Sequence, residues 1–379
     1  MRILFLSWRD PENPKAGGAE LFTHEVASRL VAGGDSVEWF TAGFPGSAPE
    51  AELAGVRVVR GGRQWSVHLA ATRRYRGRLR GSFDAVVDEV NTIPFFTPLW
   101  AGIPRLLLIF QLAREVWWHE APFPLNAVGY AAEPLYLRAY RDTPALTISR
   151  STADDLRRLG IRAPVTILPI GLEPITVPTV GKAVPATFLY VGRMAPSKRV
   201  DDIIRAFALY RERGGEGRLW LVGEGSGEYL ASLRALAESV GLAAHVDFLG
   251  RLPADEKHDR MARATVLLMA SVREGWGLSV AEANACGTPA VVYDVPGLRD
   301  AVRDGETGLV VAATPRAMAD GMARLTDDTA LHARLAAEAK RWSSTFSFQA
   351  AAEALRAAIA AEVGAAGRDP GTAASRPGR

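Results

Sequence analysis

The stretch Glu274-Gly275-Trp276-Gly277-Leu278-Ser279-Val280-Ala281-Glu282-Ala283 joins an apolar strand-like run to a helical pattern. Glu274 lies before the expected helix and Glu282 lies inside it, eight positions later. The first amides of a helix have no partner within the helix and carry a positive partial charge. We therefore predict a phosphate site where the helix begins, at Gly277, Leu278 and Ser279. The two carboxylates can hold hydroxyl groups on either side of that phosphate, an order of contacts that fits a sugar, a diphosphate and a ribose.

The rest of the chain alternates apolar strand-like runs with amphipathic helical stretches, which predicts parallel sheets with crossover helices. In the first half, strands are expected at Ile3–Ser7, Val37–Thr41, Val56–Val59, Ala85–Glu89, Leu106–Phe110, Ala145–Ser149 and Thr166–Leu168. In the second half, they are expected at Thr187–Val191, Leu219–Val222, Val246–Leu249, Val266–Met269 and Ala290–Tyr293. The predicted fold class is α/β, with two doubly wound, Rossmann-like sheets that face each other across a cleft. Ligands of such sheets bind beyond the carboxyl ends of the strands.

The domain boundary follows from the segment Leu172–Gly181, which is rich in Pro, Thr and Val and has the composition of a linker. We place the first domain at residues 1–176 and the second at residues 180–344. A C-terminal helix is expected within residues 345–364, where an apolar periodicity continues to Val363. Residues 365–379 lack such a periodicity and are predicted to form a disordered tail.

The composition limits the classes of protein to which this chain can belong. The formal net charge of +3 is too small for a dedicated nucleic-acid binder. A single cysteine, Cys286, excludes an intrachain disulfide and indicates a reducing compartment. The apolar run at the N-terminus is short for a signal peptide, and no stretch reaches the roughly 20 apolar residues of a membrane span. We therefore expect a cytoplasmic protein.

Two further motifs carry groups that bind anions. Gly17 and Gly18 follow the first strand and open a helix, so the backbone there can approach an anion closely. Arg193 and Lys198 follow a strand of the second half and can neutralise the charge that grows on a leaving diphosphate. Because no Asp-x-Asp spacing occurs, no acidic platform for a divalent metal is predicted, and these cations would take its place.

A dinucleotide site is the competing interpretation of the turn Gly223-Glu224-Gly225-Ser226-Gly227, with Asp247 about twenty residues later. The glycine spacing is G-x-G-x-G instead of the G-x-G-x-x-G of NAD-binding turns. A tight turn at the rim of the cleft explains this glycine spacing better than a dinucleotide site does.

Taken in order, these motifs resemble those of the family-4 retaining glycosyltransferases, which have the GT-B fold. The resemblance covers the chain from Met1 to about Val363. It rests on a set of motifs spread along both halves: Gly17-Gly18-Ala19-Glu20, Val191-Gly192-Arg193 with Lys198, Gly223-x-Gly225, Phe248-Leu249-Gly250, the pair Glu274 and Glu282, Gly287-Thr288-Pro289, Pro296-Gly297 and Gly305-x-Thr307-Gly308.

The resemblance implies a metal-independent transfer of a hexosyl group from a nucleotide diphosphate sugar, UDP-sugar by family frequency, with retention of configuration. The first domain would bind the acceptor, such as a natural-product core, a lipid carrier or a glycan, and the second would bind the donor. The leaving phosphate would accept the acceptor proton, and the C-terminal helix would cross back to the first domain. No cofactor besides the nucleotide sugar is expected. The implied catalytic residues are Glu274, Arg193 and Lys198. The implied donor-binding residues are Gly17, Gly18, Arg193, Lys198, Arg251, Leu252, Glu274, Gly277, Leu278, Ser279 and Glu282.

One departure from the family pattern concerns the acceptor side. Members often carry a histidine just after the strand that here ends in Phe110 and Gln111, and neither of these residues can carry a proton. A donor-binding partner subunit without turnover is therefore one alternative, and a sugar-nucleotide epimerase or hydrolase of the same architecture is another. The acceptor-side candidates are Asn91, Phe110, Gln111, Glu115 and His119.

The segment Trp65–Arg80 carries a dense set of arginines on the flanks of a helical face formed by Ala71, Tyr75 and Leu79. A core-facing helix with a solvated basic edge explains this pattern, and peripheral docking to anionic lipid or to a phosphorylated acceptor is the functional alternative. The arginines are Arg73, Arg74, Arg76, Arg78 and Arg80.

Overall fold

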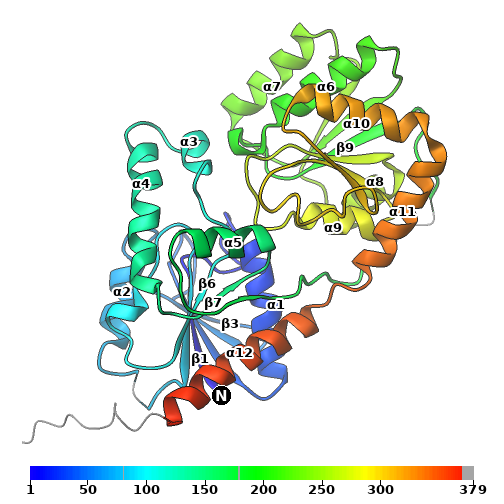
Figure 1. Ribbon diagram of the computed structural model, residues 1–379. Coiled ribbons are helices and arrows are strands. Elements are labelled where there is room, and N and C mark those ends of the chain that lie inside the picture. The colour runs from blue at the N-terminus through cyan, green and yellow to red at the C-terminus, as the bar shows by residue number, and fades with distance from the viewer. Residues whose placement is uncertain (80, 178–179, 369–379) are drawn as a thin grey trace, which may run out of the picture.

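The protein, seen here in a computed structural model that describes residues 1–79, 81–177 and 180–368, consists of two α/β domains that face each other (Figure 1). Each domain is built on one sheet, and the strand orders are β3-β4-β2-β1-β5-β6-β7-β8 and β11-β10-β9-β12-β13-β14. The predicted fold class, two Rossmann-like domains that face each other, is therefore confirmed.

In the N-terminal sheet, β1 lies at the centre and pairs in parallel with β2 and β5, so that Ile3 lies opposite Val37 and Ala85. Its strands are β1 (Arg2–Leu6), β2 (Ser36–Thr41), β3 (Glu50–Leu53), β4 (Val56–Arg60), β5 (Ala85–Glu89), β6 (Arg105–Leu108), β7 (Ala145–Thr147) and β8 (Val165–Ile167). The edge strand β3 was not predicted, and it pairs antiparallel with β4. Its sequence Glu-Ala-Glu-Leu has no apolar run, because a strand at an exposed edge does not have to bury both faces.

Both faces of this sheet are covered, which explains the continuous apolar runs in its strands. Phe5 packs on the side of α1, whereas Leu4 and Leu6 pack on the side of α2. The helices of this domain are α1 (Gly18–Ala32), α2 (Val67–Tyr75), η1 (Thr97–Leu99), α3 (Val116–Glu120), α4 (Leu125–Leu137), η2 (Arg138–Tyr140) and α5 (Arg150–Arg158). Helix α2 ends well before Arg80, because the chain turns at Gly77, whose φ is +78°. Arg80 itself lies outside the described residues.

The sheet of the C-terminal domain is built in the same way around a central strand, β9, which pairs in parallel with β10 and β12. Its strands are β9 (Thr187–Val191), β10 (Arg218–Val222), β11 (Val246–Gly250), β12 (Val266–Met269), β13 (Ala290–Tyr293) and β14 (Gly308–Val311). The edge strand β14 was not predicted either. Its helices are η3 (Pro196–Lys198), α6 (Val200–Glu212), α7 (Gly227–Ser239), α8 (Ala254–Arg263), α9 (Leu278–Ala285), α10 (Pro315–Asp327) and α11 (Thr329–Ser343).

The last helix, α12 (Phe348–Arg368), leaves the C-terminal domain and lies along the N-terminal one, next to α1 (Figure 1). Phe348, Leu355 and Ile359 are buried in the same core as Phe22 of α1. The helix runs beyond residue 364, so residues 365–368 are helical where a tail was predicted. Alanines on both sides of Gly364 favour helix and compensate for the glycine. The remainder of the predicted tail, residues 369–379, lies outside the described residues.

Within the described ranges, no helix combines the length and the apolar character needed to cross a membrane.

Candidate active site

The two domains enclose a cleft of about 1210 Å³, which we call the interdomain cleft. It lies where parallel strands of both sheets end, as expected for α/β folds. The predicted site residues that line it are Gly17, Gly18, Asn91, Phe110, Gln111, Arg193, Lys198, Arg251, Glu274, Gly277, Leu278 and Ser279. Four predicted residues do not line it, namely Leu252, Glu282, Glu115 and His119.

Helix α9 begins at Leu278 and presents its first amides to the cleft. Gly277 precedes the helix with φ of +103°, a left-handed conformation that glycine adopts without strain. No side chain caps this helix start, and within the described part of the chain no acceptor is recorded for the amides of Leu278 and Ser279. Unpaired amides at the positive end of a helix are a site for an anion.

The start of α1 approaches the start of α9 from the other domain. A Cβ atom placed on Gly18 would lie 2.8 Å from Cδ1 of Leu278, so a glycine allows the two helix starts to come this close. The Gly17 amide already donates a hydrogen bond of 2.7 Å to Glu20 Oε2. The prediction that this turn approaches an anion therefore concerns Gly18 more than Gly17.

The Glu274 carboxylate lies at the centre of the polar contacts. Lys198 Nζ donates to its Oε1 over 2.5 Å, and Ser271 Oγ donates to the same oxygen over 2.7 Å. The backbone is fixed as well, because the Glu274 amide donates to the Pro296 carbonyl at 3.0 Å. At Gly297, which has φ of +86°, a Cβ atom would lie 2.0 Å from the Glu274 carbonyl oxygen. Glycine is therefore required where this loop packs against Glu274.

The loops after β9 and β10 pack on each other through glycines. A Cβ atom on Gly223 would lie 1.9 Å from the Gly192 carbonyl oxygen, and one on Gly225 would lie 2.4 Å from that of Met194. The glycine-rich turn therefore serves close packing of the loops that carry Arg193. Asp247 pairs with Arg218, the first residue of β10, at 2.6 Å, so it lies far from the carboxyl ends of the strands. This geometry argues against the dinucleotide interpretation.

Glu120 occupies the cation side of the cleft. It comes from α3 in the N-terminal domain and lies 3.2 Å and 3.3 Å from the Arg193 guanidinium nitrogens. Ser197 Oγ also donates to it over 2.5 Å. A carboxylate thus sits where the sequence predicts a diphosphate. The only sequence clue was its position in the aromatic segment Trp117-Trp118-His119-Glu120.

Glu282, which was predicted to hold the ribose, lies in the second turn of α9. Both of its carboxylate oxygens accept from Lys257 Nζ of α8 over 2.8 Å. A shift of Lys257 would free this carboxylate, so the ribose contact stays a prediction.

The acceptor-side candidates do not all lie together in the cleft. Phe110 is almost fully buried and packs edge-to-face on Phe22, with 5.4 Å between ring centroids. Gln111 lines the cleft, whereas Glu115 pairs with Arg273 at 2.8 Å outside it. Asn91 lines the cleft and donates to Glu20 over 3.1 Å.

Glu20 organises the N-terminal wall of the cleft, a role that the sequence indicated only through its place in the Gly17-Gly18-Ala19-Glu20 motif. Besides Asn91, it binds Arg9 Nε at 2.7 Å. Behind it lies Glu89, the last residue of β5, which accepts from Thr23 over 2.8 Å. Burial raises the pKa of the Glu89 carboxyl to about 8, and the negative charge of Glu20 adds to the effect. Glu89 is therefore largely protonated at neutral pH.

These features define the class of protein, and known families match both halves of the chain. Residues 16–174 match the family model described as Glycosyltransferase Family 4. Residues 181–342 match the one described as Glycosyl transferases group 1. The chain belongs to the family-4 glycosyltransferases with the GT-B fold, as the sequence motifs indicated.

Curated relatives share the name D-inositol 3-phosphate glycosyltransferase. The protein of Rhodococcus opacus (strain B4) is 38% identical over 172 residues, which cover 44% of this chain and 39% of that relative. The match thus spans about two fifths of the relative's length. The protein of Streptomyces griseus subsp. griseus is 29% identical over 399 residues, covering 91% of this chain and 84% of that relative.

Solved structures support the fold. Sucrose-phosphate synthase from Thermosynechococcus elongatus superposes with a TM-score of 0.79 at 20% identity, covering 96% of this chain and 99% of the other. Anabaena HepE in complex with UDP and glucose superposes with a TM-score of 0.71 at 18% identity, covering 95% and 100%. At these identities the similarity concerns the fold alone.

Proposed function

We propose that the protein transfers a sugar from a nucleotide diphosphate sugar, with UDP as the favoured nucleotide, to a hydroxyl group of an acceptor, with retention of configuration. One observation carries this proposal. The uncapped start of α9, with two amides free of recorded partners, faces the same cleft as Arg193, Lys198 and Glu274. Amides and cations suit a diphosphate, and a carboxylate suits sugar hydroxyls.

The proposed chemistry needs no protein base. The acceptor oxygen forms a bond to the anomeric carbon as the bond from that carbon to the diphosphate oxygen breaks on the same face. The released diphosphate oxygen takes the proton of the acceptor hydroxyl. Lys198, Arg193 and the amides of α9 stabilise the negative charge that develops on the diphosphate. Electrostatic stabilisation of this kind is usually the largest single contribution to lowering the activation barrier.

For the acceptor, a polyol phosphate such as an inositol phosphate is the first candidate. The curated relatives carry that substrate in their name. In this chain Lys15 adds a cation to the N-terminal wall of the cleft, where Arg9 is paired with Glu20. Natural-product cores, lipid carriers and glycans remain the alternatives and belong in the same assay.

Independence from metals is a further proposal, which rests on Arg193 and Lys198 as replacements for a divalent ion. Turnover in EDTA equal to turnover in added Mg²⁺ would support it, and a loss of turnover that Mg²⁺ restores would contradict it. The cytoplasmic location is also a proposal, tested by cell fractionation. Lipid contact through Arg73, Arg74, Arg76, Arg78 and Arg80 remains a prediction.

A donor-binding subunit without turnover is the second candidate, and Phe110 is the observation that favours it. Its side chain fills the core between the helices and the sheet, so the usual histidine position holds no polar group. This candidate predicts nucleotide binding without acceptor-dependent release of nucleoside diphosphate.

The test has a binding step and a turnover step. A thermal-shift panel of UDP, GDP, ADP, dTDP and NAD identifies the base, since ligand at about 100 Kd adds about 2.7 kcal/mol of stability. Release of nucleoside diphosphate from the matching sugar donor is then measured with each acceptor, and the anomer of the product is determined by NMR.

Lys198→Met should abolish most of the release, whereas Lys340→Met, an exposed lysine of α11, should not change it. Full activity of Lys198→Met would overturn the assignment of the site. Nucleotide binding without release for any acceptor would favour the second candidate.

A further inference from the structure

A second hollow, of about 500 Å³, opens in the N-terminal domain at the edge of the sheet opposite the interdomain cleft. Arg2 and Ser36, the first residues of β1 and β2, line it. The cleft instead lies beyond the carboxyl ends of the same parallel sheet, next to Asn91 and Phe110. The two hollows share no lining residue, so they are separate sites.

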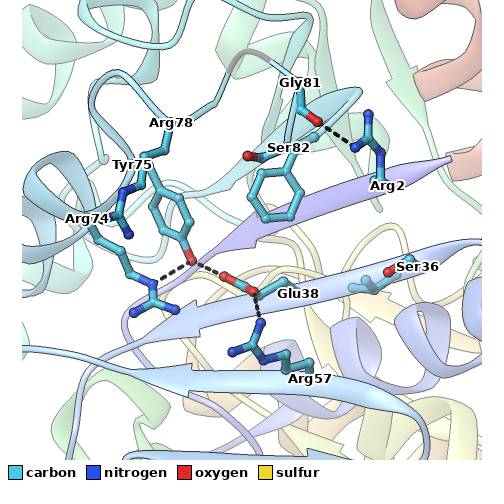
Figure 2. A pocket seen from close by; sticks show the side chains of 11 residues that line it. Arg2, Ser36, Glu38, Arg57, Arg74, Tyr75, Arg78, Gly81 and Ser82 are labelled. Carbon is cyan, nitrogen blue, oxygen red and sulfur yellow. Dashed lines mark hydrogen bonds and ion pairs between the residues drawn. The ribbon is translucent and has the colours of Figure 1, made fainter.

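The floor of this hollow is a buried polar pair. The Tyr75 hydroxyl donates to Glu38 Oε1, and Arg57 Nη1 donates to Glu38 Oε2 over 3.0 Å. The Tyr75 ring is held by edge-to-face contacts with Phe40 at 5.6 Å and with Phe83 at 5.8 Å. Figure 2 shows Arg74, Tyr75, Glu38 and Arg57 joined in one series of hydrogen bonds and ion pairs along the hollow.

Four arginines line the hollow, which we call the basic pocket: Arg2, Arg57, Arg74 and Arg78. Two of them are neutralised by carboxylates. Arg2 pairs with Asp84 at 3.0 Å, and Arg57 pairs with Glu38 and with Glu50 at 3.0 Å and 3.1 Å.

The other two have no recorded carboxylate partner within the described residues. Arg74 Nε donates to the Tyr75 hydroxyl over 3.3 Å, and its guanidinium lies 5.7 Å from the centroid of the Tyr75 ring. In the part of the chain that the structure describes, the Arg78 guanidinium has no partner. Both lie at the C-terminal end of α2 or just beyond it. Figure 2 shows them on one side of the Tyr75–Glu38 pair, with Arg2 on the other side. The surplus of positive charge is thus local and faces an open hollow.

We propose that the basic pocket binds a small phosphate-bearing anion through Arg74 and Arg78. Guanidinium groups match the oxygens of a phosphate in a two-pronged geometry, and Arg74 and Arg78 can offer it without first leaving a carboxylate partner. A volume of about 500 Å³ suits a small molecule, and the Phe83 and Tyr75 rings supply an apolar wall for its body. Because the pocket is separate from the cleft, its occupant does not compete with a nucleotide there.

Two sources carry this chemistry, a free phosphorylated metabolite and the headgroup of an anionic lipid. Glucose 6-phosphate in isothermal titration calorimetry probes the first. Co-sedimentation with vesicles of phosphatidylglycerol and phosphatidylcholine, compared with phosphatidylcholine alone, probes the second. Neither measurement depends on the glycosyl-transfer activity, so each can fail independently of the proposed function.

The deciding comparison uses two double variants with the same loss of charge. Arg74→Gln/Arg78→Gln removes the cations that face the pocket, and Arg73→Gln/Arg76→Gln removes exposed arginines of the same segment that do not line it. We expect the first variant to lose at least tenfold in affinity for one of the probes and the second to keep the wild-type affinity.

Loss of glucose 6-phosphate binding in the first variant alone identifies a metabolite site, and loss of vesicle binding in that variant alone identifies a headgroup site. Equal losses in both double variants would mean unspecific attraction by a basic helix end and would overturn the proposal. Absence of binding of either probe to the wild-type protein would overturn it as well.

Discussion

The ion pair of Glu120 with Arg193 tests whether Arg193 binds the diphosphate of the donor. The Glu120 carboxylate crosses from α3 to Arg193, with N–O distances of 3.2 Å and 3.3 Å, and also accepts a hydrogen bond from Ser197. If Arg193 binds the diphosphate of the donor, the nucleotide has to displace this carboxylate. Glu120→Gln keeps the shape of the side chain and removes its charge, so it should strengthen the binding of UDP.

The expected size of the effect follows from exposure. The Arg193 side chain is 63% exposed and that of Glu120 is 26% exposed, so water screens the ion pair strongly. Exposed ion pairs contribute about 0.2–1 kcal/mol. Since about 1.4 kcal/mol corresponds to a tenfold change in Kd, removal of the competitor should tighten UDP binding by about 1.4- to 5-fold. The gain should shrink at high salt, which screens the same pair.

Isothermal titration calorimetry with UDP, at low and high salt, measures this change. Glu115→Gln is the matched control, because Glu115 lies on the same segment but pairs with Arg273, outside the cleft. Its affinity for UDP should equal that of the wild type. Equal or weaker binding of UDP to Glu120→Gln than to the wild type would refute the reasoning, and the diphosphate would then have to bind away from Arg193.

Three further predictions concern other parts of the molecule. Leu355→Ala should lower the free energy of unfolding of the N-terminal domain by about 2–5 kcal/mol in urea denaturation, because this α12 side chain is only 1% exposed and packs into the core of that domain. The control substitution Glu353→Ala, at an exposed position of the same helix, should have little effect. Glu89 has its pKa raised by burial from 4.5 to about 8, so the folded protein binds a proton that the unfolded chain releases, and stability should fall as pH rises from about 4.5 to about 8. In Glu89→Gln this fall should be smaller, and an unchanged pH profile of the denaturation midpoint would contradict the assignment. Finally, if Glu282 leaves Lys257 to hold the ribose, Glu282→Gln should weaken the binding of UDP by about tenfold, because one charge-assisted hydrogen bond is lost. The binding of inorganic pyrophosphate, which has no ribose, should weaken much less.

The sequence located the main elements because most strands are buried on both faces and therefore appear as continuous apolar runs. The exceptions are informative. Strand β3 has an exposed edge and no apolar run, and β14, which was also not predicted, has only two fully buried residues. Helix α12 continues past Gly364 because Ala361 before it and Ala365 and Ala366 after it favour helix. Local composition thus predicts an element well only where burial constrains every residue of it.

For the site, the amino-acid sequence by itself determined the anion-binding groups, since a helix start after a glycine and cations after a strand are local features. Gly277, Leu278, Ser279, Arg193 and Lys198 all line the cleft. Only the tertiary structure decided which charges meet. Glu120 reaches Arg193 over 73 positions of the chain, and Lys257 reaches Glu282 over 25. Such pairings depend on the packing of whole domains and helices, and nothing in the spacing of residues along one segment encodes them.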